Sequence, residues 1–215
     1  MQRLAIVGAG DLGLQLAHLA STSAQYTLAG FFDDTREPGT AVAGAAVMGG
    51  VDAIAGLYAQ GHFDCLVIAI GYKHMRERQA VYARFSGQIP FATLIHPGAL
   101  IDSSCVLGEG TVIYTGCVLD MEARIGANVL LNAGCVVGHH SEISSGCFLS
   151  PAVSIAGFVK VEPGCVLGIG TIVIDNVRLT TGVRTGAGAV ITGNIEEPGL
   201  YLGIPARFAK AISST

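Results

Sequence analysis

Residues 113–137 read IYTGCVLDMEARIGANVLLNAGCVV, and an aliphatic residue stands at every sixth position of this stretch. The spacing continues in both directions without an insertion, and only one member of the whole series, Thr185, is not aliphatic. A period of six fits neither the 3.6-residue period of a helix nor the alternation of one long strand. The series comprises Ile95, Ile101, Leu107, Ile113, Leu119, Ile125, Leu131, Val137, Ile143, Leu149, Ile155, Val161, Leu167, Val173, Leu179, Thr185 and Ile191.

A second series of small or β-branched residues follows each of these positions by four residues. It includes five of the six cysteines, namely Cys105, Cys117, Cys135, Cys147 and Cys165. Short strands that turn a corner every six residues can point one large and one small side chain inward per face. We therefore predict a parallel β-helix over residues 95–196, with about 5.7 coils of three hexapeptides each. The cysteines are interpreted as small buried hydrophobic side chains.

The composition points to a small-molecule partner. The chain is 51% hydrophobic and 13% charged, with a net charge of −4 and no block of Lys or Arg. This pattern disfavours nucleic acid and an anionic membrane as partners. No apolar run is long enough for a membrane span, and the first residues read as a strand and not as a signal peptide, so a cytoplasmic protein is expected. The sequence contains no CxxC, and we expect neither disulfides nor a metal site.

Residues 1–94 have the pattern of a Rossmann-like βαβ domain, and residues 197–215 form a short C-terminal tail. The expected elements are a strand over Arg3–Val7, a helix from the following glycine turn to about Ser21, strands over Thr27–Phe32 and Cys65–Ile70, and a helix over about 73–85.

The glycine turn Gly8-Ala9-Gly10-Asp11-Leu12-Gly13 is the dinucleotide fingerprint GxGxxG. Its glycines let the backbone approach a pyrophosphate at a helix N-terminus, and an acidic residue about 20 positions later, here Asp33, would hold a ribose. The front domain is only about half of a full dinucleotide fold. A nucleotide sugar is therefore favoured over NAD or a purely structural turn.

A histidine is the natural general base near neutral pH. His18, His62, His74 and His96 lie within or near the ends of predicted elements and are interpreted as structural or solvated. The pair His139-His140 differs because it occupies the third and fourth places of a hexapeptide, at a corner of the prism. Both are candidate catalytic residues.

The whole chain resembles the bacterial sugar acetyltransferases that include sialic acid O-acetyltransferases and nucleotide-linked 4-amino-sugar N-acetyltransferases of the bacillosamine and perosamine type. The resemblance runs through the glycine turn, Phe32-Asp33-Asp34, Ala69-Ile70-Gly71, the segment Leu131–His139 and the tail Gly203-Ile204-Pro205-Ala206-Arg207.

This resemblance implies a left-handed β-helix, a homotrimer with active sites between adjacent prisms, and a role in polysaccharide biosynthesis. It implies acetyl-CoA as co-substrate and His139 as the base. The nucleotide-linked (UDP or GDP) amino sugar would contact Gly10, Asp11, Leu12, Asp33, Asp34, Gly71 and Asn132. Acetyl-CoA would lie along the β-helix against Gly157, Ile169 and Ala187, with the missing side chain of Gly157 leaving room for the thioester.

Two positions depart from the family pattern. The family usually places Asp or Glu directly after the base, where this chain has His140, and Phe148 replaces a second family histidine. His139 must therefore be oriented by another group, for which Glu142, a backbone carbonyl and a neighbouring subunit are candidates. O-acetylation of a sugar, a non-catalytic nucleotide-binding trimer and a trimeric zinc enzyme remain alternatives to N-acetylation.

Overall fold

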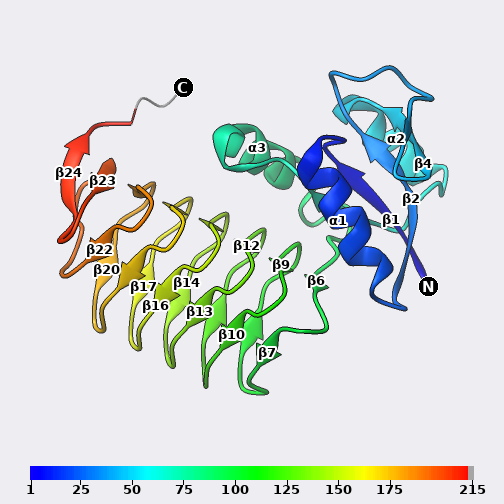
Figure 1. The fold of residues 1–215 in the computed structure, drawn as a ribbon. Coiled ribbons are helices and arrows are strands. Elements are labelled where there is room, and N and C mark those ends of the chain that lie inside the picture. Colours follow the sequence, from blue (N-terminus) through cyan, green and yellow to red (C-terminus); the bar gives the residue numbers. More distant parts are fainter. Residues whose placement is uncertain (213–215) are drawn as a thin grey trace. The chain divides into compact units, whose positions relative to one another are not determined.

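The computed structural model describes residues 1–212, so residues 213–215 of the predicted tail lie outside the described part. The chain divides into two compact units, Met1–Pro97 and Gly98–Thr215. Figure 1 shows helices and longer strands in the first unit and a regular stack of short strands in the second.

The first unit is built on a five-stranded sheet with the order β3-β4-β2-β1-β5. Strands β1, β2, β4 and β5 are parallel, and β3 pairs antiparallel with β4. The strands are β1 (Gln2–Val7), β2 (Tyr26–Phe32), β3 (Ala41–Val42), β4 (Ala45–Gly49) and β5 (Cys65–Ile68).

Helix α1 (Asp11–Ser21) connects β1 to β2, the 3₁₀ helix η1 (Val51–Ala53) and α2 (Ile54–Ala59) connect β4 to β5, and the 3₁₀ helix η2 (Tyr72–His74) and α3 (Met75–Phe85) follow β5. The predicted βαβ order is confirmed. Strand β5 ends at Ile68, two residues before the predicted end. The β3–β4 hairpin and α2 were not predicted. Strand β6 (Leu94–Ile95) lies at the end of this unit.

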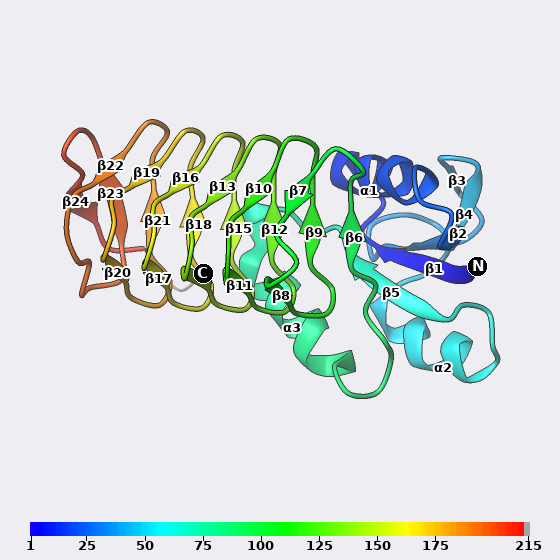
Figure 2. The ribbon, with the colours of Figure 1, turned by 90° about the horizontal axis from the view of Figure 1, so that it is seen from below.

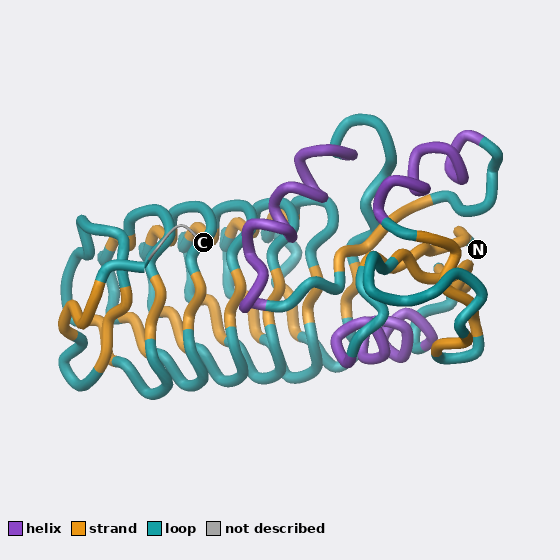
Figure 3. Tube along the Cα trace, turned by 90° about the horizontal axis from the view of Figure 1, so that it is seen from above, coloured by secondary structure: helices purple, strands orange, loops and turns teal. Residues whose placement is uncertain are grey.

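The second unit consists of two-residue strands joined by tight corners, visible as alternating strands and loops in Figure 3. These strands are β7 (Leu100–Ile101), β8 (Val106–Leu107), β9 (Val112–Ile113), β10 (Val118–Leu119), β11 (Arg124–Ile125), β12 (Leu130–Leu131), β13 (Val136–Val137), β14 (Glu142–Ile143), β15 (Phe148–Leu149), β16 (Ser154–Ile155), β17 (Lys160–Val161), β18 (Val166–Leu167), β19 (Ile172–Val173), β20 (Arg178–Leu179), β21 (Arg184–Thr185) and β22 (Val190–Ile191).

Each strand pairs in parallel with the strand one coil further along the chain. Leu119 pairs with Val137, and Ile125 pairs with Ile143, so the register is 18 residues. Figure 2 shows β7, β10, β13, β16, β19 and β22 in this order along one face. The β8–β20 and β9–β21 series form the other two faces. Such a run of short parallel strands is typical of a left-handed β-helix, and the predicted fold class is confirmed.

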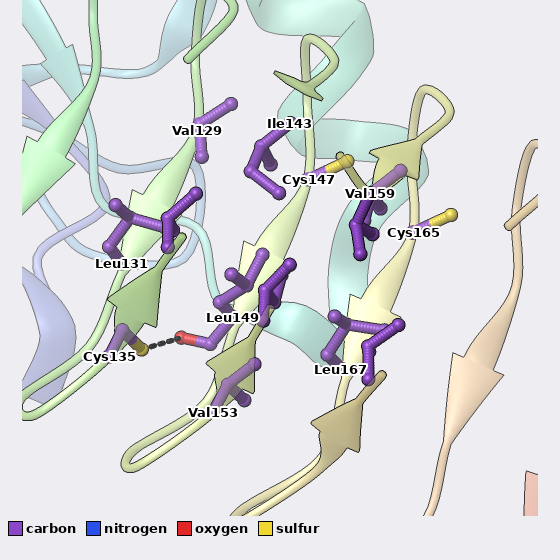
Figure 4. Close-up of a cluster of buried hydrophobic side chains, with 14 of the residues drawn as sticks. Val129, Leu131, Cys135, Ile143, Cys147, Leu149, Val153, Val159, Cys165 and Leu167 are labelled. Carbon is purple, nitrogen blue, oxygen red and sulfur yellow. Dashed lines mark hydrogen bonds between the residues drawn. The ribbon is translucent and has the colours of Figure 1, made fainter. Parts of the chain in front are cut away.

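The predicted aliphatic series forms the core of the prism. From Ile113 to Ile191 every member is buried, and Leu131, Leu149 and Leu167 stack on one another in successive coils (Figure 4). The first members differ: Ile95 is 39% exposed, and Ile101 is only half-buried. These residues belong to the start of the series, where fewer coils are present to cover them.

The five cysteines of the second series are buried thiols, except Cys105, which is half-buried; like Cys65, none of the five forms a disulfide. Each Sγ lies near a carbonyl oxygen 15 residues further along the chain, for example Cys135 Sγ at 3.2 Å from Ser150 O. Ser141 Oγ donates a 2.7 Å hydrogen bond to Ala156 O in the same register. These small residues therefore bridge successive coils with a side-chain donor as well as filling the corner.

The faces of the prism differ in their outward side chains. The face formed by β7, β10, β13, β16, β19 and β22, here called the apolar face, presents exposed Leu100, Val118, Val136 and Ile172. The face formed by β8, β11, β14, β17 and β20 carries mainly charged residues, with Arg124, Glu142, Lys160 and Arg178 one above another.

The C-terminal strands close the last coil. Strand β23 (Leu200–Leu202) continues the ladder of β21, and β24 (Arg207–Lys210) pairs antiparallel with β23. A hairpin at the end of a solenoid covers the open strand edge. Among residues 1–212, no helix combines the length and apolar character that crossing a membrane requires.

Candidate active site

The glycine turn connects β1 to α1 as the fingerprint predicts. Gly8 has a φ of +105°, and a Cβ on Gly13 would collide with the carbonyl oxygen of Gly8. These two glycines therefore allow α1 to start tightly against the end of β1. Gly10 is the N-cap residue, so no side chain caps the first N–H groups of α1, and the space where its Cβ would lie is open. The first-turn N–H groups of α1 and its positive dipole end are suited to an anion.

The two aspartates that follow β2 accept hydrogen bonds from backbone N–H groups, Asp33 from the glycine turn and Asp34 from the start of η1. Asp33 Oδ2 accepts a 2.8 Å hydrogen bond from Ala9 N–H, and Asp33 Oδ1 accepts from the N–H and hydroxyl of Thr35. Asp34 Oδ1 accepts from Val51 N–H at 2.8 Å. Burial raises the pKa of the Asp33 carboxyl, but the hydrogen bonds from Thr35 and Ala9 outweigh it, so this pKa lies below its ordinary value.

Gly71 follows β5, and the space beside its Cα is also open. The preceding loop is held by Arg78 of α3, a fully buried residue whose Nη1 donates to Ile68 O at 2.8 Å and Ile70 O at 3.2 Å. Sequence reasoning missed this arginine, because a single Arg in a polar helix carries no sign of burial.

Because β2, β1 and β5 are adjacent and parallel, their carboxyl ends lie at one edge of the sheet. This edge brings together six of the predicted site residues: Gly10, Asp11, Leu12, Asp33, Asp34 and Gly71. It has the features of a phosphate and ribose site, namely a helix N-terminus, a glycine turn and fixed carboxylates.

The histidine pair lies at the corner between β13 and β14. The Nδ1 atoms of His139 and His140 are 3.2 Å apart. On its other side, His140 Nε2 lies 3.3 Å from Glu122 Oε2. Glu122 is the residue one coil earlier in the same corner, and sequence reasoning missed it.

Glu122, His140, Phe158 and Asn176 form a column of residues 18 positions apart, all with φ between 57° and 58°. This shared left-handed backbone gives the four residues the same place in successive corners. The Phe158 ring stacks on His140 at 4.9 Å with an interplanar angle of 23°, and its edge meets His139 at 5.0 Å and 88°. The Phe158 N–H also donates to His139 O at 3.0 Å.

Gly157 lies one coil after His139, as predicted, but the space above it has a different use. A Cβ built on Gly157 would lie 2.6 Å from His139 Cε1 and 2.7 Å from His139 Nε2. The absence of a side chain at position 157 therefore leaves room for the His139 ring, which occupies the space that was predicted for the thioester.

The remaining predicted residues lie at other corners. The side chain of Asn132 donates to Leu149 O at 3.0 Å. Its corner, like those of the exposed Ile169 and Ala187, precedes a strand of the apolar face, whereas His139 and Gly157 lie after such strands. These residues thus flank the apolar face in two groups. Glu142, a candidate for orienting His139, is directed to Lys160 at 3.8 Å.

The described residues 1–212 contain no group of three or more His, Cys, Asp or Glu side chains placed to hold a metal ion. The histidine pair instead has one carboxylate and one aromatic ring as its immediate neighbours. An exposed corner with a histidine held in this way is suited to proton transfer to or from a bound molecule.

Known proteins resemble this chain in sequence and in fold. Residues 3–83 match the PglD N-terminal domain family. Perosamine N-acetyltransferase from Caulobacter crescentus, solved as a histidine-to-asparagine mutant with CoA and GDP-perosamine, is 30% identical with a TM-score of 0.88, and the match covers 98% of each chain.

The chain belongs to the sugar acetyltransferase family that includes this perosamine N-acetyltransferase. A second similar structure, the acetyltransferase domain of PglB from Neisseria gonorrhoeae with acetyl coenzyme A, is 26% identical with a TM-score of 0.87, covering 97% of this chain and 99% of that one. WeeI from Acinetobacter baumannii, at 20% identity and a TM-score of 0.81, shares the fold over 97% of this chain and all of its own. A search of curated protein sequences found no match.

Proposed function

We propose that this chain is an acetyl-CoA-dependent N-acetyltransferase acting on the amine of a nucleotide-linked 4-amino sugar. The observation that carries the proposal is His139, an incompletely buried histidine whose ring is positioned by His140, Phe158 and the gap at Gly157. The full-length similarity to an enzyme solved with CoA and GDP-perosamine supports this acceptor class.

His139 is the general base of the proposed reaction. It removes a proton from the sugar amine as the nitrogen attacks the thioester carbonyl, and a tetrahedral oxyanion forms. The C–S bond then breaks, the CoA sulfur leaves and takes up a proton, and the new amide bond remains on the sugar. The acetyl group passes directly between substrates, with no covalent enzyme intermediate.

The nucleotide sugar binds at the sheet edge of the first unit. The first turn of α1, with Gly10, Asp11 and Leu12, faces the diphosphate, because its N–H groups attract an anion. Asp33, Asp34 and Gly71 complete this site. The nucleotide is UDP or GDP.

Acetyl-CoA lies along the β-helix against Gly157, Ile169 and Ala187. Both groups of residues border the apolar face, whose exposed Leu100 and Ile172 favour burial against another prism. We place this face in a homotrimer, with active sites between adjacent prisms. The enzyme is cytoplasmic and contributes to polysaccharide biosynthesis, in which nucleotide-activated sugars donate the sugar units.

A thiol-release assay tests the function directly. The chain is mixed with acetyl-CoA and, one at a time, UDP-, GDP-, dTDP- and CMP-linked sugars with and without a free amine. The expected result is release of CoA thiol with a UDP- or GDP-linked 4-amino sugar only. Release with sugars that offer only hydroxyls would make the enzyme an O-acetyltransferase, and release with none would favour a non-catalytic binding protein.

A further inference from the structure

His139 has a histidine, and not a carboxylate, as the neighbour of its Nδ1 atom. The carboxylate nearest to this pair belongs to Glu122, whose Oε2 lies 3.3 Å from His140 Nε2. The three side chains therefore form one continuous chain of contacts, from Glu122 through His140 to His139.

We propose that Glu122 is a positioning residue for the reaction: through His140 it fixes the tautomer of His139 that leaves Nε2 free to accept a proton. This proposal rests on the proposed acetyltransferase function. A neutral imidazole carries one N–H and one acceptor nitrogen. A carboxylate only accepts, so His140 carries its hydrogen on Nε2 and presents Nδ1 as an acceptor. His139 then donates from Nδ1, and its lone pair is on Nε2.

The opposite arrangement leaves a poor contact. If His140 donated from Nδ1 to His139, its bare Nε2 would face the negative oxygen of Glu122. Only the first arrangement satisfies both short contacts with neutral rings. When His139 takes up the proton of the amine, its positive charge is also stabilised by the Glu122 charge transmitted through His140, as an aspartate stabilises the imidazolium of a catalytic triad.

The fold holds this chain in place. The backbone N–H of His140 donates to Met121 O at 3.0 Å, and the backbone N–H of Glu122 donates to Ser104 Oγ at 2.8 Å. The Phe158 ring stacks on His140 and restricts its rotation. Glu142, two residues after His140 in the chain, is directed to Lys160. Within residues 1–212, Glu122 is therefore the carboxylate in contact with the pair, and it comes from the preceding coil.

Kinetics of matched variants test the proposal. Glu122→Gln keeps the side-chain size but removes the charge, and Glu142→Gln makes the same change beside the pair without touching it. We expect Glu122→Gln to lower kcat by ~10- to 100-fold, the range found for partners that orient metal-bound histidines, with both KM values within about twofold. Glu142→Gln should keep the kcat of the unmodified chain. Equal kcat values for the two variants would overturn the proposal.

A double-variant cycle separates positioning from a general structural effect. If Glu122 acts through His140, adding Glu122→Gln to His140→Asn should lower kcat no further than His140→Asn alone, because the connecting ring is gone. Asn suits the left-handed backbone of position 140, so this variant retains the corner. If the two substitutions instead lowered kcat independently, so that their effects multiplied in the double variant, Glu122 would not act through His140.

NMR of ¹⁵N-histidine-labelled protein gives a readout that does not depend on turnover. The unmodified chain should show His139 with its hydrogen on Nδ1 and His140 with its hydrogen on Nε2, and Glu122→Gln should produce mixed tautomers. The reverse tautomers in the unmodified chain would overturn the proposal. If the unmodified chain released no thiol with any acceptor, the acetyltransferase function would fail, while these spectra would still decide whether Glu122 orders the pair.

Discussion

The ring of His139 lies in the space that a side chain at position 157 would occupy. The two residues are one coil apart, and the nearest ring atom would be 2.6 Å from a Cβ on Gly157. Real Cβ atoms do not approach another atom so closely, so residue 157 determines whether the His139 ring can adopt its observed position.

Gly157→Ala should therefore displace the histidine ring and lower kcat by ~10-fold or more, because a misplaced base loses much of its effect. Gly157 does not have a positive φ, so alanine is compatible with its backbone, and the thermal midpoint should change little. Gly193→Ala is the control, since open space surrounds that position. An unchanged kcat in Gly157→Ala would show that the observed ring position is not needed for turnover.

His139→Asn should lower kcat by ~10²- to 10⁴-fold, because the amide cannot accept a proton near neutral pH. Acetyl-CoA binding, measured by calorimetry, should persist. His140→Asn should be milder, since this residue only orients the base. The two variants should be compared at several pH values, because an amine that is already deprotonated at high pH depends less on a general base. A fully active His139→Asn alongside an inactive His140→Asn would assign the base to His140.

Asp33→Asn should raise the KM for the nucleotide sugar by ~10-fold, as expected for loss of a charged hydrogen-bond acceptor. The KM for acetyl-CoA should stay within about twofold. The matched control is Asp52→Asn, a highly exposed carboxylate paired with Arg84. Equal increases for both substrates would indicate a damaged fold and not a nucleotide site.

The same carboxylate predicts an acid limit for folding stability. The pKa of Asp33 is lower in the folded chain than in the unfolded chain. Its contribution to stability is therefore fully present above the unfolded pKa of about 4, and it is lost as the pH falls through the folded pKa. Urea unfolding at several acidic pH values should show a smaller loss of stability in Asp33→Asn than in the unmodified chain.

The thiols of the folded chain should resist alkylation. Burial, aided by the negative charge of Asp64, raises the pKa of the Cys65 thiol to about 11, and burial raises the pKa of Cys147. At pH 8 only the half-buried Cys105 should react with iodoacetamide, and all six should react in urea. Mass spectrometry after digestion identifies the labelled sites. Rapid native labelling of Cys135 or Cys147 would contradict the buried core.

The β-helix could be predicted because its environment repeats. Leu131 and Leu149 have the same surroundings one coil apart, so the same residue type recurs in the sequence and the period becomes visible. The glycine turn was equally readable, since only glycine fits at Gly8 and Gly13. By contrast, the β3–β4 hairpin and α2 lie in an Ala- and Gly-rich stretch without a clear period.

The surroundings of His139 were predictable only in part. The 18-residue register identifies Glu122 as the residue one coil before His140, so the sequence contained the signal for their proximity. It did not show that the two side chains would turn toward each other, because that depends on the left-handed backbone of their shared corner. The hydrogen bond from Ala9 N–H to Asp33 was unpredictable for a similar reason, because it depends on how the end of β2 meets the glycine turn.

The 18-residue register also limits how such a chain can change in length. An extra residue within a strand such as β13 or β14 would turn the inward side chains that follow it toward the surface, so an insertion there must loop out at a corner. Duplication of a whole coil, however, would preserve every pairing. The separation between the histidine corner and the closing hairpin can therefore change only in steps of one coil, about 4.8 Å each. A ligand that spans these two places would be matched to a whole number of coils.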